Sequence, residues 1–128
     1  MNPETLAPPR GYSNGMVLSG GDVLFVAGQI GWNDACQFES DELAQQSAQA
    51  LRNVLAVLAE AGARAEHIVR MTWYVTDKHD YLSATRDIGA VYRELMGEHY
   101  PAMSLVEVSA LLEERAKVEI EATAVIPD

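Results

Sequence analysis

Short stretches rich in β-branched, aromatic and alternating apolar residues predict the strands of this chain. They lie at residues 22–30 (DVLFVAGQI), 68–76 (IVRMTWYVT), 102–110 and 117–126 (KVEIEATAVI). A further strand at 16–19 (MVLS) is expected to form a hairpin with 22–30. Gly20 and Gly21 between them suit the positive φ values of a two-residue turn.

Apolar residues recur at helical spacing in two longer segments. The first segment contains Leu43, Ser47, Leu51, Val54, Leu55 and Leu58. It predicts a helix over about 41–61, with Ser40 and Asp41 as N-caps and Gly62 as a left-handed end. The second segment contains Tyr81, Thr85, Ile88, Tyr92 and Leu95 and ends at Gly97, which predicts a second helix.

The element order places each helix between strands, so both helices should cross over on one face of the sheet. In the last strand one side carries Val118, Ile120, Ala122, Ala124 and Ile126, which we expect to lie beneath the helices. The sequence therefore predicts an α+β fold with a mixed sheet and two helices packed on one face. A single domain, 12–128, should follow an arm at 1–11, which contains three prolines and no periodicity.

The opposite face of the sheet also needs a cover. In 22–30 and 68–76 apolar side chains occur at both odd and even positions, and therefore on both faces of the sheet. Only two helices are available to cover them. Large exposed apolar patches are uncommon on monomers, so we expect a second copy of the chain to supply the cover. The prediction is a homo-oligomer with a small-molecule pocket between subunits.

Composition narrows the function classes. The 128 residues suffice for one domain, and no stretch is apolar enough for a membrane helix. The N-terminus lacks a signal peptide pattern, so cytoplasmic localisation is expected. The net charge is −10 and the nine basic residues are scattered, which argues against a nucleic-acid partner.

Glu119 and Glu121 are the sharpest candidates for chemistry, because both lie on the uncovered face of the last strand. A carboxylate partly desolvated there would suit a general base that acts on water, although a solvated or ion-paired face has the same pattern. Gly28 near the end of 22–30 indicates a bulge or a close backbone approach to a ligand. Tyr12 and Trp73 are candidates for pocket walls, with core or interface as the alternative.

No metal site is expected. Asp77, His79 and Asp80 match no established ligand spacing, and a surface loop accounts for them more simply. Cys36 is the only cysteine, so it cannot form an internal disulfide, and we interpret it as a free loop thiol.

Several motifs in order resemble the reactive intermediate deaminase A family, also called RidA or YjgF, from about Gly11 to Ile126. The motifs are GY at 11–12, FVAGQI at 25–30, AGA at 61–63, VTD at 75–77, YPAMSLVEV at 100–108 and VEIEATAV at 118–125. The resemblance implies a chorismate-mutase-like α+β fold, assembled as a homotrimer with a central barrel and pockets between subunits. It also implies hydrolysis of enamines or imines to 2-keto acids and ammonia, with no metal or organic cofactor.

The resemblance also assigns roles to residues. Glu119 matches an acidic residue that positions the attacking water, and Tyr12 matches a pocket tyrosine. Gly28 and Leu105 match positions whose backbone groups contact the ligand. Gly89 stands where an asparagine is often found.

Met103 stands where the family has an arginine that binds the substrate carboxylate. A thioether offers neither charge nor donor, and losing such a contact in a desolvated pocket costs about 2–5 kcal/mol of binding. Ordinary hydrolysis of 2-iminopropanoate is therefore not expected. Met103 and Trp73 would make the pocket more apolar, and Arg70 on a neighbouring strand is a candidate replacement cation.

The leading hypothesis is a divergent enamine or imine deaminase, or a related cofactor-free hydrolase, in which Glu119 activates water. The alternative is a non-catalytic trimer that keeps the pocket and binds a small metabolite. A third reading, endoribonuclease activity, has been ascribed to relatives, and the charge of −10 weighs against it.

Overall fold

A four-stranded sheet in the order β1-β4-β2-β3 forms the framework of the structure, a computed structural model that describes residues 1–128. The strands are β1 (Asp22–Ile30), β2 (Ile68–Val75), β3 (Ala102–Glu107) and β4 (Val118–Ile126). β4 pairs antiparallel with both β1 and β2, whereas β2 and β3 are parallel. The sheet is mixed, as the sequence predicts.

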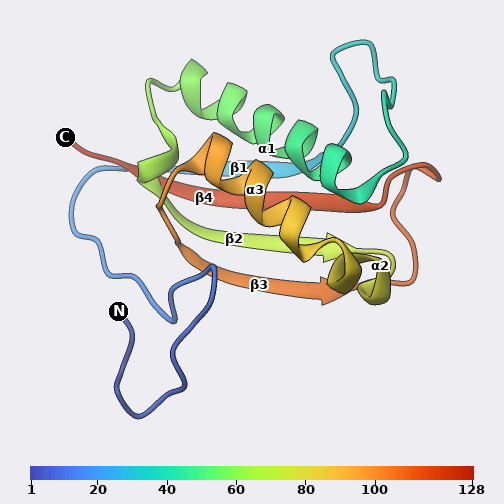
Figure 1. The fold of residues 1–128 in the computed structure, drawn as a ribbon. Coiled ribbons are helices and arrows are strands. Elements are labelled where there is room, and N and C mark those ends of the chain that lie inside the picture. The colour runs from blue at the N-terminus through green and yellow to red at the C-terminus, as the bar shows by residue number, and fades with distance from the viewer.

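Three α-helices accompany the sheet, and α1 and α3 lie over the same face of it (Figure 1). They are α1 (Leu43–Glu60), α2 (Lys78–Ser83) and α3 (Thr85–Met96), with a 3-10 turn at Ala65–His67. The prediction of one continuous second helix is wrong, because the chain breaks at Ala84 between α2 and α3. The Asp77 carboxylate starts α2 separately by accepting the backbone N–H groups of His79 and Asp80.

The core lies between the sheet and the helices. Four of the five alternating β4 residues predicted for the core are buried there, and Ile126 at the strand end is half-buried; Met71, Trp73 and Val75 of β2 lie beside them. From α1, a stripe at helical spacing contributes the fully buried Leu51, Val54 and Leu58. At the end of α1, Gly62 adopts the predicted left-handed conformation, with φ 73°.

The predicted hairpin before β1 is wrong. Residues 16–19 form no strand, and the Val17 side chain is 72% exposed. Gly20 and Gly21 do have positive φ, but a Cβ on Gly21 would collide with the carbonyl oxygen of Ile126. The two glycines therefore let the chain enter β1 close to the end of β4, where no side chain fits.

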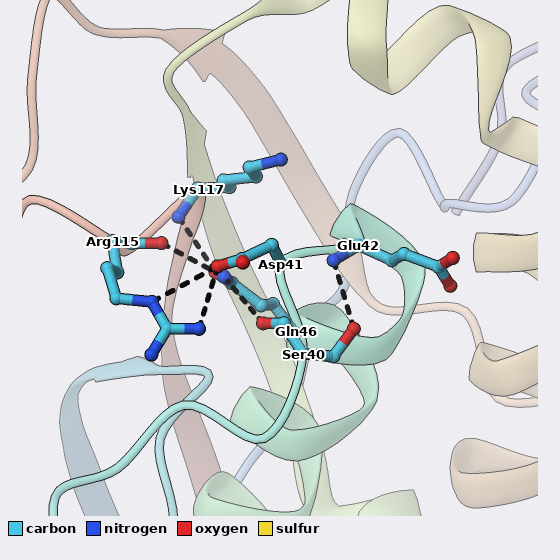
Figure 2. Close-up of polar contacts among 6 residues, drawn as sticks. All are labelled: Ser40, Asp41, Glu42, Gln46, Arg115 and Lys117. Carbon is cyan, nitrogen blue, oxygen red and sulfur yellow. Dashed lines mark hydrogen bonds and ion pairs between the residues drawn. The ribbon is translucent and has the colours of Figure 1, made fainter.

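The start of α1 differs in detail from the prediction. Glu42 occupies the N-cap position, and the Ser40 hydroxyl accepts its backbone N–H at 3.0 Å. Asp41 forms an ion pair with Arg115 at 2.8 Å (Figure 2). The Nε and Nη2 groups of Arg115 both donate to Oδ1 of Asp41. The two predicted caps thus fasten the segment before α1 without capping the helix itself.

Gln46 joins α1 to the start of β4 (Figure 2). Its buried amide donates to the carbonyl oxygens of Ser40 (3.1 Å) and Arg115 (2.9 Å) and accepts the backbone N–H of Lys117 (2.8 Å). A Cβ on Gly31 would lie 2.6 Å from the Cβ of Gln46, so a glycine lets the chain after β1 pass this close to α1. The contact fixes the strand that carries Glu119.

Candidate functional site

A cavity of about 850 Å³ opens on the helical side of the sheet, lined by the N-terminal arm, β2, β3, α2 and α3. Five of the residues predicted for the site line it, namely Tyr12, Trp73, Gly89, Met103 and Leu105. The remaining lining residues are Arg10, Gly11, Tyr81, Thr85, Ile88, Tyr92, Arg93 and Tyr100. Its size suits a small organic molecule.

The register of the parallel pair explains why β3 contributes to this cavity. Met103 lies opposite Met71, and Leu105 lies opposite Trp73. Because Met71 and Trp73 are buried beneath the helices, the side chains of Met103 and Leu105 share the helical side. Met103 therefore lies on the helical side of the sheet, where it lines the cavity.

The N-terminal arm closes one side of the cavity. The Ser13 backbone N–H donates to the carbonyl oxygen of Pro101 (3.0 Å), and its hydroxyl donates to that of Tyr100 (2.6 Å). These bonds hold Tyr12, which is 38% exposed, at the cavity beside the edge strand β3.

Tyrosines form the polar part of the wall. The rings of Tyr92 and Tyr100 stack with centroids 5.8 Å apart, and the Tyr92 hydroxyl donates to the carbonyl oxygen of His99 at 2.7 Å. Burial raises the pKa of Tyr81 and of Tyr92, so both phenols stay protonated at neutral pH. Tyr81 can donate a hydrogen bond to a ligand, whereas the hydroxyl proton of Tyr92 is used by the His99 carbonyl, and neither phenol suits the role of a base.

Trp73 brings an unpaired donor to the same cavity. Its side chain is 2% exposed, and its indole N–H is buried without an acceptor in the protein. An unsatisfied buried donor of this kind costs about 1–3 kcal/mol.

Glu119 and Gly28, the other two predicted site residues, lie together on the opposite face of the sheet. Glu119 is aligned with Ile30 of β1 and Tyr74 of β2. A Cβ on Gly28 would lie 2.6 Å from Oε2 of Glu119, so the carboxylate occupies space that only a glycine leaves free. Within one chain, the carboxylate and the cavity are thus separated by the sheet.

Comparison with known proteins identifies the family. The model of the family described as endoribonuclease L-PSP matches residues 3–126, nearly the whole chain. The chain belongs to the Rid/YjgF family. In this Rid protein the predicted α+β fold is that of its structural relatives.

Three relatives illustrate the likeness. A RutC family protein of Sinorhizobium fredii is 39% identical over 103 residues, which cover 80% of this chain and 78% of the relative. The 2-iminobutanoate/2-iminopropanoate deaminase of Escherichia coli K12 is 35% identical over 117 residues, or 89% and 86% of the two chains. A crystal structure of a Rid family protein of unknown function from Yersinia pestis superimposes with a TM-score of 0.88 at 32% identity, covering 98% and 96% of the chains.

The open face of the sheet also carries a second cluster of polar side chains, formed by Arg70, Thr72, Tyr74 and Glu121. The Tyr74 hydroxyl donates to Glu121 at 2.7 Å, and this bond is the main reason why the pKa of Tyr74 is raised. Arg70 lines a hollow of about 460 Å³ here, together with Thr72 and Glu121. Arg70 is absent from the cavity lining, so the first cavity draws its positive charge from other residues.

The remaining candidates of the Rid protein have structural explanations. The Asp77 carboxylate caps α2, and no group of three His, Cys, Asp or Glu side chains is arranged to hold a metal ion. Cys36 is an exposed thiol in the loop after β1. No helix has both the length and the apolar character needed to cross a membrane.

Sequence reasoning missed the two arginines that line the cavity, Arg10 and Arg93. Arg93 lies on α3 four residues after Gly89, which places both residues on one side of the helix. That spacing was visible in the sequence. Arg10 belongs to the arm, whose course along β3 follows no periodic signal.

Proposed function

We propose that this Rid protein is a cofactor-free hydrolase of enamines or imines, in which Glu119 activates water in a pocket shared between subunits. The observation that carries the proposal is the pairing of Glu119 with Gly28, because the carboxylate rests over a strand that has no side chain there. The missing side chain at position 28 is what allows the carboxylate to lie there. A relative named as a 2-imino acid deaminase supports the reaction class.

The chemistry asked of Glu119 is proton transfer. An enamine first takes a proton at carbon and gives one up from nitrogen to solvent, and so becomes an imine. Water then adds to the imine carbon as Glu119 removes one of its protons, and the C=N electron pair moves to nitrogen, which is protonated. Glu119 then gives its proton to nitrogen as the C–N bond of the carbinolamine breaks, and the hydroxyl proton passes to solvent, which balances the solvent proton taken up at nitrogen in the addition step. A carbonyl compound and ammonia leave, and the carboxylate is restored.

The proposal requires a second subunit, because the sheet separates Glu119 from the cavity within one chain. The open face that carries Glu119 also exposes apolar side chains, with Val23 at 56%, Phe25 at 77% and Val106 at 43%. Another copy that covers this face would remove the apolar surface from water. We propose a homotrimer in which Glu119 and Gly28 of one subunit complete the cavity of its neighbour.

Ammonia release tests the proposal. Purified protein would be supplied with enamines and imines of varied side chain, generated in the assay, and compared with Glu119→Gln and with Glu121→Gln. Glu121 is the matched control, since it lies on the same face of the same strand and is bonded to Tyr74.

We expect Glu119→Gln to lower turnover by about 10²- to 10⁴-fold, the usual contribution of a general base. Glu121→Gln should retain most of the activity. The proposal fails if no substrate of the panel releases ammonia, or if the two variants behave alike.

One observation favours a second candidate, a trimer that binds a metabolite without converting it. No carboxylate or histidine lines the cavity, and burial keeps Tyr81 and Tyr92 protonated. A thermal shift with ligand and no ammonia release from any member of the panel would establish this binding role.

A further inference from the structure

The lining of the cavity has an unusual charge balance for this chain. The protein carries a net charge of −10, yet the cavity is lined by Arg10 and Arg93 and by no Asp or Glu. The arginines that form ion pairs within the chain are Arg64 and Arg115, both elsewhere. Two guanidinium groups without a carboxylate partner therefore converge on one apolar-walled space, which favours an anionic ligand.

Gly89 shapes the position of Arg93. A Cβ on Gly89 would lie 3.2 Å from Nη1 of Arg93, so the guanidinium folds back over the glycine along α3. Any side chain at position 89 would crowd it. The glycine thus leaves room for a cation at the helix wall of the cavity, opposite the strand residues Met103 and Leu105.

The other lining residues indicate what kind of ligand body the cavity would accept. Trp73, Met103 and Leu105 offer apolar and aromatic surface from β2 and β3, and Trp73 also has its unpaired buried N–H. A bare small anion would leave these groups uncovered. A ligand with both an anionic end and an apolar or aromatic body matches the two sides of the cavity.

We propose that Arg93, assisted by Arg10, is the anion receptor of the cavity, and that the ligand is a carboxylic acid with an aromatic or large apolar side chain. The inference rests on the proposed function in that it names the substrate class of the same site. The acid end lies against α3 and the arm, and the apolar body lies against β2 and β3. Arg70 takes no part, since it lines the hollow on the other face.

Calorimetric binding of stable product analogues tests the receptor without any turnover. The probes are 2-oxo-4-phenylbutanoate, 4-phenyl-2-butanone, which has a methyl group in place of the carboxylate, and pyruvate, which lacks the aromatic body. We expect the first to bind at least about 10-fold more tightly than either of the others, as charge-assisted and apolar contacts each contribute.

Variants then locate the receptor. Arg93→Met should weaken binding of 2-oxo-4-phenylbutanoate by about 10- to 100-fold and leave the neutral ketone unchanged, as for loss of a charge-assisted hydrogen bond. Arg93→Lys should restore part of the affinity. Arg93 and Arg10 are both exposed, but only Arg93 packs closely against the helix wall, at Gly89, so Arg10→Met should cost only about 2- to 5-fold. Arg86→Met is the matched control, an exposed arginine of α3 outside the cavity lining.

The receptor is overturned if the wild-type protein binds none of the probes, if acid and ketone bind equally, or if Arg93→Met behaves like Arg86→Met. Failure of the proposed hydrolase function can be distinguished from failure of the proposed receptor. Tight acid binding without ammonia release would leave the receptor standing and remove the catalysis. Ammonia release whose kcat and KM are unaffected by Arg93→Met would remove the receptor and leave the catalysis.

Discussion

Replacing Gln46 should weaken the protein more than any exposed polar substitution on α1. Its side chain is 1% exposed and makes three hydrogen bonds, two as donor and one as acceptor, which join α1 to the segment leading into β4. The partners are backbone groups of Ser40, Arg115 and Lys117 (Figure 2). In Gln46→Ala these groups lose their partner and part of the space is left empty.

The expected loss follows from the number of bonds. A neutral hydrogen bond contributes about 1 kcal/mol net, and a buried group left without a partner costs about 1–3 kcal/mol. Three such bonds place the loss for Gln46→Ala at about 3–5 kcal/mol. For a domain of this length, that corresponds to a fall in Tm of roughly 10–20 °C.

Urea unfolding at fixed protomer concentration, followed by circular dichroism, would measure the loss, because the stability of an oligomer depends on concentration. The matched control is Gln45→Ala, one residue earlier on α1 and exposed, which should change stability by about 0.5 kcal/mol or less. Equal effects of the two substitutions would refute the role of Gln46.

The variant Gln46→Glu adds a pH test. Its carboxylate would still accept the Lys117 N–H, but it would face the carbonyl oxygens of Ser40 and Arg115 without a donor. Burial then raises the pKa of the introduced carboxyl above its unfolded value, so the protonated form is favoured in the folded state. Stability relative to the wild type should fall as pH rises from about 4 to 8. A difference that is flat with pH would contradict this reasoning.

Three further substitutions probe the site and the assembly. Gly28→Ala should displace the Glu119 carboxylate, whose Oε2 lies 2.6 Å from the new Cβ, and lower ammonia release by about 10- to 100-fold without weakening keto-acid binding; an unchanged rate would contradict the placement. Phe25→Glu should dissociate the oligomer in light scattering, whereas Leu112→Glu, at a 95% exposed loop residue, should not; intact oligomers in both would exclude the open face as the interface. Met103→Arg should tighten pyruvate binding by about 10-fold or more, since a guanidinium supplies donors that a thioether lacks; unchanged affinity would show that position 103 does not reach the ligand.

Hydrophobic patterning was sufficient to predict the sheet and its covered face. The alternation in β4 identified Val118, Ile120, Ala122 and Ala124 as core residues, and the structure buries all four. The pattern succeeded there because β4 is a central strand, with neighbours on both edges and helices on one face. The two-residue period of the strand then matches the burial of these four side chains.

The errors arose where a local pattern depends on a distant partner. The segment 16–19 has the composition of a strand, but the one neighbour of β1 within the chain is β4, so 16–19 pairs with nothing there. Met103 is a further position that its own strand does not settle, because its face is decided by alignment with Met71 across a parallel pair. No local property of either residue specifies that register.

The candidate site was predicted only in part, because its assembly also depends on partners that are distant in the sequence. Tyr12, Trp73, Gly89, Met103 and Leu105 do share a cavity, whereas Glu119 and Gly28 form a separate group on the other face. In the proposed function their union requires a second subunit, and the apolar pattern of one chain indicates a covered face without specifying which residues of another copy meet it.

The proposal of a site shared between subunits is tested most directly by complementation between two inactive variants. Glu119→Gln lacks the base but keeps the cavity, whereas Met103→Trp keeps the base and places a bulky ring in the cavity; both parent variants are first shown to be inactive alone. In trimers reassembled from an equal mixture, random assortment should restore about one quarter of the wild-type sites. We predict ammonia release near that level. Mixed oligomers as inactive as their parents, alongside wild-type protein that survives the same reassembly, would contradict a site built from two subunits.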